Sequence, residues 1–195
     1  MTLAAKVRTH KISPDAALCV SGSYNLIGAE SPAIEAMTDL SRVSAVTISA
    51  GASLAIANSS MIVRGVRLLL VTGEGGRLEG LISTADTLGE KPMQVMQARG
   101  ATHDELTVGN LMTPVSDVDM LLLKDVMNAR VVDILDALKS LGRQHILVED
   151  IDPASGLPRV RGIFSATHIG RLLGVSVHTF DLARTFGEIE AALVN

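Results

Sequence analysis

Aromatic side chains are nearly absent from this sequence of 195 residues: they make up 2% of it, with one Tyr and no Trp. Proteins that bind single-stranded nucleic acid stack the bases on aromatic rings and attract the phosphates with a basic surface. The formal net charge of −4 provides no such field. We therefore expect no nucleic-acid partner, and a hydrophobic core built from aliphatic side chains.

Cysteine is also scarce, because Cys19 is the only one and no disulfide can form within the chain. Such sparse use of cysteine is typical of reducing compartments. No apolar run reaches the roughly 18 residues of a membrane-spanning helix. Charged residues such as Lys6 and Asp15 interrupt the region where a signal peptide would have its apolar core. We expect a cytoplasmic protein with no membrane partner.

Catalytic and metal-binding motifs are missing as well. No nucleophile–base pair is recognisable in the sequence. His145 and His168 have no Cys, Asp or Glu at metal-ligand spacing in their motifs. We therefore expect a protein that is not an enzyme and that requires neither a metal nor a cofactor.

The most prominent feature that is present is an internal repeat. Gly80–Asp86 (GLISTAD) returns as Gly162–His168 (GIFSATH), and Gly65–Val71 matches Gly142–Val148 in the same order. Segments that recur in a fixed order indicate a duplicated unit. The two copies differ at the last position of the first motif, where Asp86 corresponds to His168.

Each copy reads as strand, helix, strand, strand, helix. Apolar and β-branched runs predict strands, helical spacing of apolar residues predicts helices, and glycines mark their ends. For the first copy we expect strands over 45–48, 66–71 and 78–83, a helix over 54–63 that Gly65 ends, and a short helix from Ser83 to before Pro92. For the second we expect strands over 120–123, 144–148 and 160–165, and a helix over 131–138 that Gly142 closes.

These elements divide the chain into five parts. At the C-terminal end Phe186, Ile189 and Leu193 form a helical stripe, with Thr185 and Glu188 at the spacing of a capping box. This helix is expected to dock either on the repeats or on another subunit. The expected parts are an N-terminal extension over 1–32, a first repeat over 33–92, a connecting segment over 93–108, a second repeat over 109–174 and a tail over 175–195.

The motif Gly80-x-Ile82-Ser83-x-x-Asp86 joins a strand to the start of a helix. Such a junction offers backbone N–H groups and hydroxyls to a phosphate, and the carboxylate of Asp86 can accept hydrogen bonds from the two vicinal hydroxyls of a ribose. The same residues also fit a capping box, in which Ser83 and Asp86 only stabilise the helix end. The motif alone leaves both interpretations open.

The ordered pair of copies resembles the CBS domain family, in the tandem arrangement called a CBS pair or Bateman module. The resemblance rests on Met37-Thr38, on Ala45–Ile48, on the run from Ala57 to Val71 and on Gly80–Asp86, and in the second copy on Leu111–Pro114, Gly142–Val148 and Gly162–Ser165. It implies an α/β (α+β) fold of two tandem β-α-β-β-α repeats packed through their sheets, followed here by a C-terminal helix. It also implies clefts between the copies that bind AMP, ADP, ATP or S-adenosylmethionine.

The resemblance carries a ligand site over to particular residues. In the first copy these would be Val46, Thr47, Arg67, Leu68, Ile82, Ser83, Thr84 and Asp86. Ser83 and Thr84 would face the phosphate, and Asp86 would hold the ribose. A weaker second site would contain Gln144, His145, Ser165 and His168, where the imidazole of His168 cannot replace a carboxylate acceptor.

Two functions from different classes follow. The first is a regulatory module that binds an adenosine-containing ligand between the repeats, with the first copy providing the better site. The second is a dimeric protein-interaction scaffold that binds no nucleotide, in which Ser83 and Asp86 only cap a helix. A homodimer is expected in either case, because two-fold dimers are the commonest assembly.

Overall fold

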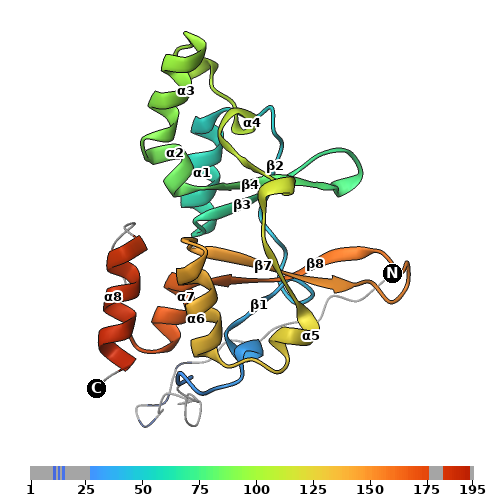
Figure 1. Cartoon of the computed structure of the whole chain (residues 1–195), viewed down its shortest axis with the longest axis vertical. Coiled ribbons are helices and arrows are strands. Elements are labelled where there is room, and N and C mark those ends of the chain that lie inside the picture. The colour runs from blue at the N-terminus through green and yellow to red at the C-terminus, as the bar shows by residue number, and fades with distance from the viewer. Residues whose placement is uncertain (1–10, 12, 14, 16–26, 176–181, 194–195) are drawn as a thin grey trace.

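The structure, a computed structural model, describes residues 11, 13, 15, 27–175 and 182–193 and contains two lobes, each built on a four-stranded sheet (Figure 1). Strands β3 and β4 of the first lobe face β7 and β8 of the second across the middle of the molecule. The expected fold class, two β-α-β-β-α units followed by a C-terminal helix, is confirmed. Cys19 and most of the expected N-terminal extension lie outside the described residues.

The first lobe holds a sheet in the order β2-β3-β4-β5, in which β2 runs parallel to β3 and the other pairs are antiparallel. Its strands are β2 (Thr47–Ile48), β3 (Leu68–Thr72), β4 (Leu78–Ser83) and β5 (Thr113–Pro114). Its helices are α1 (Leu54–Arg64), α2 (Thr84–Leu88), α3 (Lys91–Arg99) and α4 (Val108–Leu111).

The second lobe repeats this plan with a sheet in the order β6-β7-β8-β1. Its strands are β1 (Thr38–Asp39), β6 (Met120–Leu122), β7 (His145–Ile151) and β8 (Pro158–Ser165). Its helices are α5 (Leu123–Val126), α6 (Val131–Ser140), α7 (Ala166–Leu172) and α8 (Leu182–Leu193). Across the described ranges, no helix combines the length and the apolarity needed to cross a membrane.

The strand that opens each repeat pairs with the other lobe. Thr38 in β1 lies opposite Ile163 in β8, and Thr113 in β5 lies opposite Leu81 in β4. The cores follow the same exchange, since Ala33, Ala36 and Met37 pack in the core of the second lobe and Leu106, Val108 and Leu111 pack in that of the first. Each lobe is therefore completed by the segment around the start of the other repeat.

Local signals explain most of the helix ends. The Ser53 side chain accepts a hydrogen bond from the amide of Ile56 at the start of α1, and Gly65 ends that helix with a φ of 63°, a conformation that favours glycine. Helix α3 was not expected in the connecting segment. It begins at Lys91 because Pro92 fits the first turn of a helix, where its missing N–H needs no partner.

Helix α8 docks on the second lobe, which decides between the two positions expected for it. Phe186 and Ile189 are buried in that lobe's core, and the Lys139 ammonium forms an ion pair with Glu190. The helix begins at Leu182 rather than at the Thr185 capping position, so Thr185 lies inside it. The expected capping box is therefore wrong, although the expected apolar stripe faces the core.

Candidate functional site

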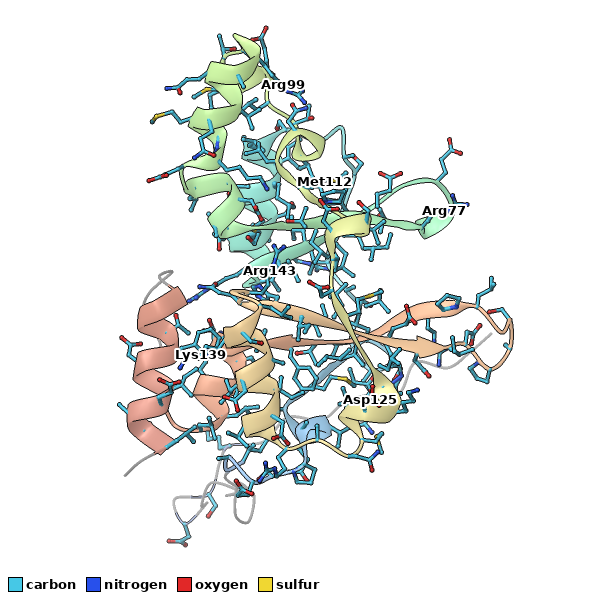
Figure 2. All side chains as sticks on the ribbon, viewed as in Figure 1. Arg77, Arg99, Met112, Asp125, Lys139 and Arg143 are labelled. Atoms are coloured by element: carbon cyan, nitrogen blue, oxygen red, sulfur yellow. The ribbon has the colours of Figure 1, made fainter. Side chains whose placement is uncertain are left out.

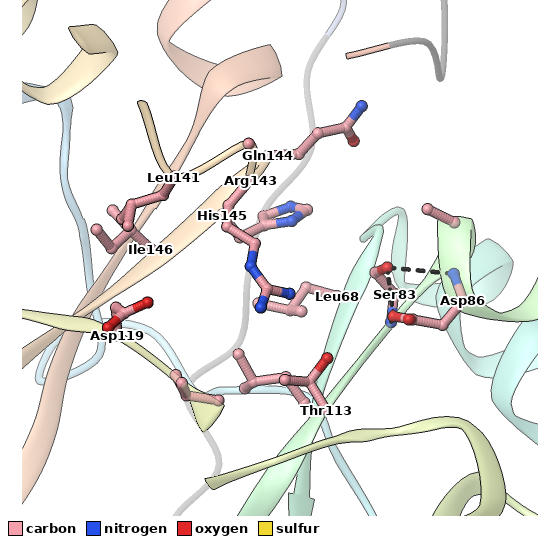
Figure 3. A pocket seen from close by; sticks show the side chains of 14 residues that line it. Leu68, Ser83, Asp86, Thr113, Asp119, Leu141, Arg143, Gln144, His145 and Ile146 are labelled. Carbon is pink, nitrogen blue, oxygen red and sulfur yellow. Dashed lines mark hydrogen bonds between the residues drawn. The ribbon is translucent and has the colours of Figure 1, made fainter. Parts of the chain in front are cut away.

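A cavity of about 220 Å³ lies between the lobes, where the turn from β4 into α2 faces the start of β7 (Figure 3). Its walls come from both repeats, so neither lobe alone would form it. The first-lobe residues are Leu68, Leu81, Ser83, Ala85, Asp86 and Thr113, and those from the second lobe are Val118, Asp119, Leu141, Gly142, Arg143, Gln144, His145 and Ile146.

Ser83 and Asp86 form a complete capping box on the first-lobe wall. The Asp86 Oδ2 atom accepts hydrogen bonds from the Ser83 amide at 2.9 Å and from the Ser83 hydroxyl at 2.7 Å. The Ser83 hydroxyl in turn accepts a longer bond from the Asp86 amide, at 3.4 Å. These bonds fix the carboxylate at the edge of the cavity.

The second oxygen of this carboxylate is held from outside the cavity. The Lys91 ammonium, on the first residue of α3, lies 3.0 Å from Asp86 Oδ1. The Lys91 side chain is 38% exposed and the Asp86 side chain 20% exposed, so this ion pair is in contact with solvent. An ion pair with this exposure is weak, because water screens it.

The opposite wall carries a cation and polar groups. Gly142, with a φ of 61°, turns the chain from the end of α6 toward β7, and this turn brings Arg143 to the space between the lobes (Figure 2). Arg143 is exposed and has no ion-pair partner among the residues that the structure describes. Arg143, Gln144 and His145 face Ser83 and Asp86 across the cavity (Figure 3). A guanidinium in this position can bind an anionic group at the mouth.

His145 contributes a neutral ring to this wall. Burial, and to a lesser extent the charge of Arg67, together lower the pKa of His145 to about 4, although the negative charge of Asp86 acts in the opposite direction. At neutral pH the imidazole is therefore uncharged and can donate one hydrogen bond and accept one.

The pseudo-equivalent region of the second repeat, around Ser165 and His168, is built differently. The Ser165 hydroxyl accepts a hydrogen bond from the His168 amide, and the His168 pKa is lowered by burial and by the charge of Arg171. The Arg67 guanidinium crosses from the first lobe and donates to the Thr167 hydroxyl at 3.2 Å. The repeat matches Arg67 to Gln144 and Thr167 to Ala85, so the first cleft lacks both members of this bridge.

The structure brings together only some of the residues expected at the first site. Leu68, Ser83 and Asp86 line the cavity. Ile82 is fully buried in the first-lobe core, and the Thr84 amide donates to the Arg67 carbonyl. Val46 and Thr47 line a separate cavity of about 430 Å³ beside α1, together with Ala45, Ser59, Ser60, Val63 and Arg64.

The sequence assigns Gln144 and His145 to the second cleft, whereas the structure places them in the first cavity. The reason is the face-to-face packing of the lobes, which sets the start of β7 against the β4–α2 turn of the other repeat. Thr113 and Asp119 also line the cavity and were not expected there. Their only signal in the sequence is that they follow the connecting segment, and pairing between lobes is not visible in a sequence.

No family model and no curated protein matches this chain. Solved structures do match it. A conserved protein from Pyrococcus horikoshii has a TM-score of 0.55 at 18% identity, over 78% of this chain and 99% of that one. The CBS domain pair of the protein MJ0100, solved with 5′-methylthioadenosine and S-adenosylmethionine, has a TM-score of 0.51 at 19% identity, over 74% and 100%. CBSX2, solved with AMP, has a TM-score of 0.50 at 20% identity, over 72% and 94%.

Proposed function

Starting from the fact that the chain has the fold of a tandem CBS domain pair, we propose that it is a non-enzymatic regulatory module that binds an adenosine-containing ligand between its repeats. The candidates are AMP, ADP, ATP and S-adenosylmethionine. The observation that carries this proposal is the cavity between the lobes, in which a fixed carboxylate faces an arginine. Complexes of two proteins of the same fold with AMP and with S-adenosylmethionine support the ligand class.

The lining suggests how such a ligand would lie. Asp86 would accept hydrogen bonds from the ribose hydroxyls, and Leu68 and Leu81 would contact the apolar faces of the base. Clefts that enclose drug-sized ligands usually measure roughly 300–1,000 Å³, and the cavity here is about 220 Å³. We infer that the base and the ribose occupy the cavity and that the charged end of the ligand lies at the mouth, beside Arg143.

The second cleft contributes no equivalent site in this proposal. His168 offers no carboxylate acceptor, and the Arg67–Thr167 hydrogen bond joins the two lobes beside it. Thr167 is only 3% exposed, so its hydroxyl would be left without a partner if Arg67 moved away. We therefore propose one ligand for each chain.

Isothermal titration calorimetry with the four candidate ligands tests the proposal. Asp86→Ala should weaken binding of the ligand by about ten- to a hundredfold, since a hydrogen bond to a charged group contributes about 1.5–3 kcal/mol. The same substitution removes a helix cap, so it needs a control. Glu105→Ala removes the equivalent capping contact with Thr102, outside the cavity, and should leave affinity unchanged.

The outcomes separate the two functions. If none of the four ligands binds the wild-type protein, the proposed function is wrong. If a ligand binds equally well to the wild type and to Asp86→Ala, the assignment of Asp86 to the ribose is wrong. A melting temperature that falls in both variants, with no ligand effect in either, would identify Ser83 and Asp86 as a helix cap alone.

One observation favours the alternative of a dimeric interaction scaffold, and it also supports the proposed homodimer. Helix α1 buries Leu54 and Met61 in the core, yet it also exposes three large apolar side chains: Ile56 (56% exposed), Ile62 (78%) and Val63 (78%). Neighbouring apolar side chains that are exposed on a surface often mark a contact with another protein. In the second lobe α8 packs beside α7 (Figure 1). We propose that a second copy of the chain covers these side chains of α1. We also propose that the protein is cytoplasmic.

A further inference from the structure

The acceptor positions of Asp86 are nearly all in use. A carboxylate offers about four such positions. The Ser83 amide and the Ser83 hydroxyl both donate to Oδ2, and the Lys91 ammonium donates to Oδ1 at 3.0 Å. One position is therefore left, on Oδ1. A ribose presents two vicinal hydroxyls, so one of the three existing contacts has to be given up when both hydroxyls bind.

The contact given up most readily is the one with Lys91. The two bonds from Ser83 belong to the cap of α2, and their loss would leave a half-buried amide and hydroxyl without partners. The Lys91 ammonium lies on a side chain that is 38% exposed and becomes hydrated as soon as it leaves. Exposed ion pairs contribute little to stability, so their displacement costs little.

We propose that Lys91 competes with the vicinal hydroxyls of the ligand for Asp86, so that binding of an adenosine-containing ligand releases Lys91 from the carboxylate. This proposal rests on the proposed function of the cavity. Lys91 is the first residue of α3, and Gly89 and Glu90 alone separate α3 from α2. Loss of the ion pair removes a link between the start of α3 and the cavity wall. Occupancy of the cavity is thereby communicated to α3 and its exposed side chains.

Competition has a signature that a direct contact lacks. If Lys91 bound the ligand, its removal would weaken binding, whereas removal of a competitor strengthens it. A ligand with a single ribose hydroxyl can use the one remaining position of Asp86 and does not displace Lys91. The effect of Lys91 should therefore depend on the second hydroxyl.

The test is calorimetric titration of wild-type protein and Lys91→Met with adenosine and with 2′-deoxyadenosine. Both probes are uncharged, so the loss of a positive charge does not disturb the comparison. We expect Lys91→Met to bind adenosine roughly two- to fivefold more tightly than the wild type does, which is the effect of removing one exposed ion pair. Binding of 2′-deoxyadenosine should not change. Lys139→Met removes the exposed ion pair with Glu190, neither of which lines the cavity, and should leave both affinities as they are.

Each outcome either supports or refutes the competition between Lys91 and the ligand. If wild-type protein binds adenosine and Lys91→Met binds it equally or more weakly, the competition is refuted while the proposed function stands. If Lys91→Met strengthens the binding of both nucleosides equally, the dependence on the diol is refuted. If adenosine binds Lys91→Met but not the wild type, the competition is supported in its strongest form. If it binds neither protein, both the competition and the adenosine site are wrong.

Hydrogen exchange provides a second measurement that does not depend on affinity. Adenosine should increase amide exchange at the start of α3 in wild-type protein, because the Lys91 contact is lost. In Lys91→Met this region should exchange faster before any addition, and adenosine should change it little. Protection of α3 by adenosine in the wild type would contradict the release of Lys91.

Discussion

The exchanged strands give a sharp prediction about two equivalent glycines, Gly80 and Gly162. Each is the first residue of its copy of the repeated motif and pairs with a strand from the other repeat: Gly80 with β5 and Gly162 with β1. A Cβ atom on Gly80 would lie 2.5 Å from the backbone oxygen of Thr113. A Cβ atom on Gly162 would meet the side chain of Met37 instead, at its sulfur and the neighbouring carbons. Neither glycine has a positive φ, so alanine is compatible with the backbone at both positions.

This difference sets the expected magnitudes. Excess volume in a packed site typically costs about 1–3 kcal/mol, and a glycine-to-alanine change returns about 0.4–1 kcal/mol by restricting the unfolded chain. In Gly80→Ala the obstacle is backbone, so β5 has to move and the pairing of Gly80 with Pro114 weakens. We expect a net loss of about 1–2 kcal/mol. In Gly162→Ala the flexible Met37 side chain can move aside, and we expect a loss below about 0.5 kcal/mol.

Urea denaturation followed by circular dichroism measures both losses in one experiment. A change of 1 kcal/mol shifts the melting temperature of a protein of this size by about 2–4 °C, so Gly80→Ala should melt about 2–8 °C lower than the wild type. Because Thr113 lines the cavity, the same variant should also bind ligand more weakly. If Gly162→Ala is as destabilising as Gly80→Ala, or more so, the distinction between backbone and side-chain obstruction is wrong.

The remaining predictions concern the pH dependence of stability and the assembly. The pKa of His145 is lowered to about 4 in the folded protein, whereas in the unfolded chain it has its ordinary value of about 6.5. Between these two pH values the unfolded chain binds the proton more readily, so the free energy of unfolding falls as the pH falls from about 6.5 toward 4. Between pH 7.5 and pH 5 the wild type should lose up to about 2 kcal/mol more than His145→Gln in urea denaturation, and equal losses would contradict this origin. In sedimentation velocity Ile62→Lys should dissociate the proposed dimer. Leu157→Lys, at an exposed position of the loop between β7 and β8, is the control and should leave the dimer intact. A wild-type protein that sediments as a monomer would refute the dimer.

Local patterns in the sequence predicted the elements well where the chain's own neighbours determine them. The strand expected over 78–83 is β4, and Gly65 ends α1 as its spacing indicates. Helix α3 was missed because Pro92 was interpreted only as the end of α2, although proline also fits the first turn of a helix. The pairing of β1 with β8 could not be predicted, because two-residue strands carry no pattern of their own and find their partners through tertiary contacts.

The candidate site depends still more on tertiary packing. The motif around Ser83 was visible in the sequence, but its partners were not. An internal repeat invites the assignment of each site to a single copy, and this assignment separated His145 from Asp86. In the structure the β4–α2 turn of one copy faces the start of β7 of the other, so the residues that share a cavity come from opposite repeats. The Lys91–Asp86 contact could not be predicted either, because it depends on α3, and α3 was missed when Pro92 was interpreted only as the end of α2.

The two clefts of this duplicated fold differ through a few substitutions that act together. At one position the first cleft has Ala85, which has no side-chain acceptor, and the second has Thr167, whose hydroxyl accepts a hydrogen bond from Arg67. At the position equivalent to Arg67 the second copy has Gln144, so it provides no long cation there that could span the first cleft in the same way. Replacing Asp86 by His168 removes the carboxylate that could hold a diol. The Arg67–Thr167 bond near one motif and the carboxylate in the other therefore both favour the proposed division, in which one half of the duplication supports the lobe interface and the other half provides the ligand site.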